Sequence, residues 1–154
     1  NKIENANESS LPALYMFGLN LGEFIFPKPV RNRMQQRNLL ESLYHRIHSL
    51  DPIYDFGSPI RLLGILYSRL PGMDVNQSKV YFDTAIRMYP NCFSHRTAKA
   101  EYYFIKSGNR ESFHNKLSQV MTLDPTKIPD IMPENLMEQG RAEILLKQES
   151  DLFE

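Results

Sequence analysis

The segment Ile60–Pro90, IRLLGILYSRLPGMDVNQSKVYFDTAIRMYP, determines the predicted fold. Apolar residues recur every three or four positions on both sides of Pro71-Gly72, which is typical of two amphipathic helices joined by a tight turn. Asp74 is well placed to cap the second helix, and the proline at the end of the segment stops it. The small residues Gly64 and Ala85 would let the two helices approach closely. The segment therefore predicts an antiparallel helix pair.

The end of this pair is repeated elsewhere in the chain. HSLDP ends at Pro52, IRMYP at Pro90 and MTLDP at Pro125, so the prolines are 38 and 35 residues apart. This spacing is close to the 34-residue period of tetratricopeptide (TPR) repeats, each of which is a helix pair. One pair cannot bury its apolar face alone, so pairs must stack. We therefore expect a TPR-like α-solenoid of three helix pairs plus a C-terminal capping helix.

The other helix boundaries follow from prolines and capping residues. We expect helices over residues 11–26, 30–50, 58–70, 74–89, 91–107, 109–123 and 134–150. No stretch alternates apolar and polar residues for long enough to be a convincing strand, so the predicted fold class is all-α. The polar residues 1–10 are predicted to be a disordered N-terminal tail, and residues 11–154 a single TPR-like helical domain.

The composition is that of an ordinary globular protein and excludes several classes. The 154 residues include 18 basic and 18 acidic side chains, so no excess charge favours nucleic-acid binding. A single cysteine, Cys92, excludes an internal disulfide and a cysteine-based zinc site. The most apolar run, residues 11–26, is shorter than the roughly 20 residues that a membrane-spanning helix needs.

The sequence also lacks the motifs of common enzymes. It has no glycine-rich phosphate loop, no nucleophile elbow and no zinc-protease motif. His45 and His48 share a helix face, but no third ligand is evident nearby, so we expect no metal and no cofactor. Glu134 and Glu138 are predicted to be solvated on a helix surface. We therefore expect the protein not to be an enzyme.

Four segments resemble one family more narrowly. ALYMFGLNLGEFI (13–25) and LDPIYDFGSPIRLLGILYSRLPG (50–72) resemble the TatT family, helical-repeat proteins associated with TRAP-type solute uptake in bacteria. AEYYFIKSGNRESFHNKLSQVMTLDP (100–125) and ENLMEQGRAEILL (134–146) also fit. The resemblance implies an exported, often lipid-anchored periplasmic protein. It also implies contact with a periplasmic solute-binding protein of a TRAP-type system, and a passage for a hydrophobic ligand.

The turn at residues 51–61 carries half of the candidate binding residues. Gly57 can adopt backbone angles that other residues resist. Tyr54, Phe56 and Arg61 are candidates to line a groove for a ligand or partner. The alternative is that this turn only fixes one helix pair against the next.

Three more candidates lie on predicted helices. Asn20 and Glu23 interrupt the apolar first helix and could hydrogen-bond a ligand, because a buried polar group needs a partner. The alternative is that they mark the solvent edge of that helix. Tyr102 is one of several aromatic residues that either line an apolar channel or belong to the core. A hydrophobic small molecule and further copies of the chain are the other partners considered.

A second function stays open from the sequence alone, namely a cytoplasmic TPR-type module that binds a partner's peptide in a concave groove. Such grooves often hold a peptide carboxylate with basic and amide side chains. His95 and Lys99 lie on the matching face of the fifth helix, but Leu62 and Leu63 occupy the corresponding places on the third. A signal peptide with a lipid-modified cysteine would favour the TatT-like function. A start methionine a few residues upstream would favour the peptide module.

Overall fold

The computed structural model describes residues 2–154, and this part of the chain is helical without a strand. The predicted all-α class is confirmed. The α-helices are α1 (Leu11–Ile25), α2 (Val30–Gln35), α3 (Arg37–Leu50), α4 (Tyr54–Arg69), α5 (Val75–Met88), α6 (Phe93–Ala98), α7 (Ile105–Ser107), α8 (Arg110–Thr122), α9 (Met132–Lys147) and α10 (Glu149–Leu152). A π-helical segment, Lys99–Phe104, joins α6 to α7, and 3-10 turns occupy Glu8–Ser10, Pro125–Lys127 and Pro129–Ile131.

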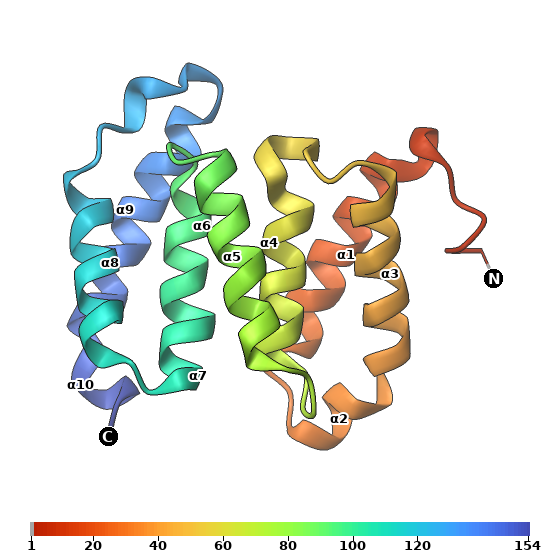
Figure 1. The fold of residues 1–154 in the computed structure, drawn as a ribbon, viewed down its shortest axis with the longest axis horizontal. Helices are drawn as coiled ribbons and strands as arrows, with labels where there is room; N and C mark the ends of the chain where they lie inside the picture. Colours follow the sequence, from red (N-terminus) through yellow and green to blue (C-terminus); the bar gives the residue numbers. More distant parts are fainter. Residues whose placement is uncertain (1) are drawn as a thin grey trace.

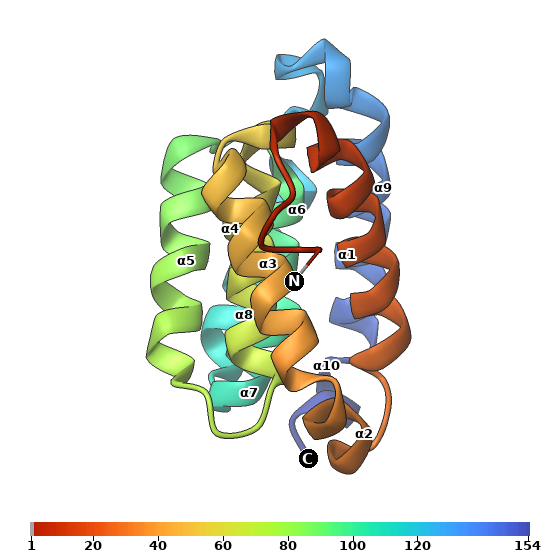
Figure 2. The ribbon, with the colours of Figure 1, turned by 90° about the vertical axis from the view of Figure 1, so that its right-hand side faces the viewer.

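The longer helices pack side by side in chain order (Figure 1). α1 contacts α3, α3 contacts α4, and the series continues through α5, α6, α8 and α9. Viewed from the side, α1 and α9 lie at one surface of the molecule and α5 at the opposite one (Figure 2). These contacts establish the order of the helices. The arrangement as a TPR-like solenoid of three helix pairs stays a prediction.

Two clusters of buried apolar residues hold the helices together. The first joins α1, α3 and α4, with Leu40, Leu43 and Ile47 of α3 fully buried. The second joins α6 and the π-helical segment to α8 and α9, around Phe113 and Leu117. Each cluster is built from helices that follow one another along the chain, because an amphipathic helix cannot bury its apolar face alone.

Glycines set the closest helix contacts. A Cβ atom added at Gly64 would lie 3.0 Å from three atoms of the buried Phe82 ring, and the Gly64 carbonyl accepts a 2.7 Å hydrogen bond from Ser78 Oγ. The predicted close approach of the first two helices of the Ile60–Pro90 segment is therefore confirmed. Gly22 likewise allows α1 and α3 to approach closely, because a Cβ atom there would lie 2.2 Å from Tyr44 Oη.

Several predicted helix boundaries were wrong for local reasons. The helix expected over 30–50 breaks at Gln36, whose ψ of 3° is not helical, and so divides into α2 and α3. The helix expected over 91–107 starts at Phe93 and widens into the π-helical segment. Asp74 caps α5 as predicted, with Oδ1 accepting a 2.8 Å bond from the Asn76 amide.

The segment before α1 contacts α3. Arg46 Nε donates to the Ala6 carbonyl at 3.1 Å, and Ile3 packs against the first apolar cluster. The division into a tail and one domain stays a prediction. In residues 2–154, no helix has both the length and the apolar character needed to cross a membrane.

Candidate binding groove

Three adjoining cavities lie along α9, and the first two of them also reach α1. The first has a volume of about 110 Å³, the second about 400 Å³ and the third about 170 Å³. The first and second share Gly22, Glu23, Phe26, Tyr102 and Arg141, and the first and third share Arg61, Ser94 and Glu138. We call the three together the groove. Its walls are α1 and α9, and its floor is formed by α4, α6 and the π-helical segment.

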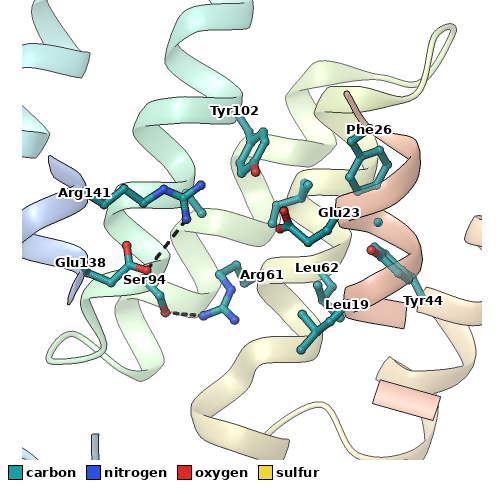
Figure 3. A pocket seen from close by; sticks show the side chains of 13 residues that line it. Leu19, Glu23, Phe26, Tyr44, Arg61, Leu62, Ser94, Tyr102, Glu138 and Arg141 are labelled. Carbon is teal, nitrogen blue, oxygen red and sulfur yellow. Dashed lines mark hydrogen bonds and ion pairs between the residues drawn. The ribbon is translucent and has the colours of Figure 1, made fainter. Parts of the chain in front are cut away.

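The groove collects four of the six residues that the sequence singled out. Glu23 and Tyr102 line the first and second cavities, and Arg61 lines the first and third. Phe56 lines the third cavity. Side chains predicted from three separate segments therefore face one space, as the close view of Glu23, Arg61 and Tyr102 shows (Figure 3).

The other two predicted residues lie outside the groove. Asn20 is exposed on α1, and its Nδ2 donates to the Met16 carbonyl of the same helix at 2.7 Å. Tyr54 packs edge-on against Tyr15, with ring centroids 5.2 Å apart, and belongs to the first apolar cluster. Tyr54 is therefore placed to support the turn.

The turn at the start of α4 has an unusual left-handed backbone, which interrupts the helix within its bounds. Asp55, Phe56 and Gly57 have φ angles of 46°, 54° and 75° in succession. Each of the two residues that carry a Cβ atom costs roughly 1–2 kcal/mol in this conformation. Such strain is retained where the surrounding structure fixes it, often at functional sites. The regular helical backbone of α4 begins after this turn, as expected for a helix over residues 58–70.

Hydrogen bonds from two neighbouring helices hold the turn. Tyr15 Oη of α1 donates to Asp55 Oδ2 at 2.7 Å, and Ser58 Oγ donates to the Asp55 carbonyl at 2.7 Å. His95 Nε2 of α6 lies 2.8 Å from the Phe56 carbonyl and acts as donor to it. The strained turn thus fixes Phe56 and the start of α4 relative to both α1 and α6.

His95 is fully buried and uncharged. Burial, with a smaller contribution from the charge of Arg61, lowers its pKa to about 3. The neutral ring therefore donates from Nε2 to Phe56. Within the described part of the chain, its buried Nδ1 has no hydrogen-bond partner.

The π-helical segment carries the centre of the groove floor. Such segments are rare and occur frequently at functional sites. Glu101 pairs with Arg141 of α9, which joins the floor to one wall. Burial raises the pKa of the Glu101 carboxyl, and the charge of Arg141 opposes that effect. On the next residue, Tyr102, burial likewise raises the pKa of the phenol.

Among the groove residues that the sequence did not propose for binding are Ser94, Glu138 and Arg141. Glu138 was predicted to be solvated, which is wrong, because its side chain is only 17% exposed and faces the groove. Glu138 and Arg141 are three residues apart on α9, so they share a helix face. That spacing was visible in the sequence, but nothing there showed that this face lines a cavity.

The residues proposed for a peptide clamp are not available. His95 is buried against the turn, and Lys99 is buried in an ion pair with Asp83 of α5. Burial also raises the pKa of the Cys92 thiol, so the reactive thiolate is disfavoured. Among residues 2–154, no three histidine, cysteine or acidic side chains gather closely enough to hold a metal ion.

Comparison with known proteins identifies the family. No curated protein matches the chain. The family model of the TRAP transporter T-component, TAtT, matches residues 1–153. This confirms the family predicted from the four resembling segments, and it associates the chain with TRAP transport rather than with an enzyme family. The chain belongs to the TRAP transporter T-component family.

Proposed function

We propose that the protein is a non-enzymatic periplasmic accessory component of TRAP-type solute uptake. In this proposal it docks a periplasmic solute-binding protein and takes a hydrophobic ligand into the groove. One observation carries the proposal: a groove with charged and apolar lining lies between two helices that both expose large apolar side chains.

The docking surface is assigned to the outer faces of α1 and α9. Met16, Phe17 and Phe24 on α1, with Leu136, Met137 and Ile144 on α9, are 49% to 75% exposed. The two sets have the same spacing, since each places two neighbouring residues about two turns before the third. We call these six the rim residues. Large exposed apolar groups on both walls of a cavity are typical of an interaction surface.

The groove itself is the proposed ligand path. Glu23, Phe56, Arg61 and Tyr102 would contact the ligand, and Tyr54 would hold the turn that positions two of them. Asn20 lies on α1 between Phe17 and Phe24, so we assign it to the docking surface. The turn's strain supports a binding function, because two successive non-glycine residues in the left-handed region are costly for a turn that only connects helices.

The remaining details of the proposal follow from the family. A T-component of a periplasmic uptake system would be exported and could be held at the membrane by a lipid. A TPR-like stacking of the helix pairs would place α1, α4, α6 and α9 along one inner surface, which agrees with the groove lining. Self-association of the chain is a further expectation, tested by light scattering on the purified protein.

The docking proposal is tested by biolayer interferometry with the solute-binding protein from the same operon. We expect saturable binding to the immobilised chain, and at least about tenfold weaker binding to Phe24→Glu and Met137→Glu, because each places a charge in an apolar contact. Val80→Glu is the matched control, since Val80 is 55% exposed on α5, away from both walls. Absence of binding, or an equal loss with Val80→Glu, would contradict the proposal.

A further inference from the structure

Arg61 has unused hydrogen-bonding capacity inside the groove. Its Nη1 donates to Ser94 Oγ, and in the described residues no carboxylate oxygen lies within 4.0 Å of its guanidinium. A guanidinium carries five N–H donors in a planar fork that matches a carboxylate in two parallel bonds. Arg61 is therefore equipped to bind a carboxylate that the chain itself does not supply.

Glu138, on the α9 wall, lacks a hydrogen-bond donor. In the part of the chain that the structure describes, its buried Oε2 has no hydrogen-bond partner. Its Oε1 is 4.0 Å from Arg141 Nη1, which is too long for a hydrogen bond. A buried carboxylate oxygen without a donor is costly, so a ligand that brings a donor gains affinity there.

An apolar surface completes the site. Leu19 of α1 and Leu62 and Ile65 of α4 line the same cavity as Arg61 and Glu138. Figure 3 shows Leu19 and Leu62 beside Arg61, with Glu138 on the far side of the cavity. The cavity thus offers one cationic group, one acidic acceptor and one aliphatic surface.

We propose that this cavity binds a small aliphatic amino or hydroxy acid. The ligand carboxylate bonds to Arg61, its amino or hydroxyl group donates to Glu138, and its aliphatic chain lies against Leu19, Leu62 and Ile65. The inference rests on the proposed function of the groove as a ligand path, and it specifies that the hydrophobic ligand carries a charged end. Docking of the solute-binding protein does not require it.

Isothermal titration calorimetry with four probes tests the assignment. Leucine and 2-hydroxy-4-methylpentanoate carry both a carboxylate and a donor, 4-methylpentanoate lacks the donor, and isopentylamine lacks the carboxylate. We expect the first two to bind, the third to bind about tenfold more weakly, and the amine not to bind. If no probe binds, or if the amine binds as well as leucine, the proposal is overturned.

Two variants assign the roles within the site. Arg61→Gln should weaken leucine binding by about 10- to 100-fold. Glu138→Gln should weaken leucine but leave 4-methylpentanoate nearly unchanged, because that probe offers nothing to the carboxylate. Arg87→Gln, at an exposed arginine of α5, should change neither affinity. Equal leucine affinity in wild type and Arg61→Gln would overturn the proposal.

Docking measured on the same protein separates the two proposals. Arg61-dependent leucine binding together with failed docking would support the ligand site and contradict the docking function. Failed probe binding together with intact docking would overturn only the ligand site.

Discussion

The two faces of α4 are built differently. Toward α5, Gly64 meets the buried Phe82 ring and its carbonyl accepts from Ser78, so packing and hydrogen bonding are complete. Toward the groove, Arg61 faces a cavity with several N–H donors unused, and Glu138 of α9 lines the same cavity with an oxygen that has no hydrogen-bond partner in the described residues. The side of α4 that faces α5 therefore serves the stability of the fold. The side that faces the groove keeps polar groups that stability alone does not require.

The largest effect is expected on the packed face. Gly64→Leu forces a branched side chain into the Phe82 ring, so we expect the free energy of unfolding to fall by about 3 kcal/mol. Urea denaturation followed by circular dichroism measures the loss. Gly140→Leu is the control, because nothing lies within 4 Å of a Cβ atom at that position of α9. Similar stabilities of the two variants would show that the α4–α5 contact is not tight.

The next effect concerns the strained turn at the start of α4. Gly57→Ala places a Cβ atom 2.8 Å from the Tyr89 ring at a φ of 75°. We expect a loss of about 2 to 3 kcal/mol, from backbone strain and crowding together. Gly108→Ala has a similar φ of 67° but no neighbour within 4 Å, so about 1 kcal/mol is expected there. Equal losses would mean that the turn is not crowded by Tyr89.

A pH-dependent effect of about 2 kcal/mol is expected from His95. Its folded pKa of about 3 lies below the unfolded value near 6.5, so the unfolded state binds the proton more readily. Stability is therefore lost as the pH falls from 6.5 toward 3. Between pH 7 and pH 5 we expect wild type to lose about 2 kcal/mol more than His95→Gln, in which the amide can still donate to Phe56. Identical pH profiles in urea denaturation would contradict the burial of a neutral His95.

The helical fold was predictable because its signals are local. The cap at Asp74 acts within one turn, and Gly64 packs against the helix that follows directly in the chain; both were interpreted correctly. The stacked repeat that the prolines indicate stays a prediction. The break at Gln36 and the π-helical segment were missed. On either side of the break at Gln36, Arg33 and Arg37 donate to the carbonyls of Arg69 and Pro71, more than 30 positions away, and such contacts override local preference.

The groove was only partly predictable for the same reason. Glu23, Arg61 and Tyr102 stood out as polar or aromatic residues in apolar surroundings, and the structure brings them together. Glu138 resembled an ordinary surface residue, because Arg61, which lines the same cavity, is 77 positions away in the sequence. The position of Asn20 outside the groove was not predictable, because an exposed asparagine on an apolar helix gives the same local pattern as one that faces a groove.

The most direct test of the comparison is the unfolding free energy of Arg61→Gln. If the groove face serves binding rather than folding, the variant should unfold within about 0.5 kcal/mol of wild type, since the guanidinium loses only its bond to Ser94. A loss of about 2 kcal/mol or more would show that Arg61 is a structural residue, and would contradict the account of α4 as a helix with one packed face and one binding face.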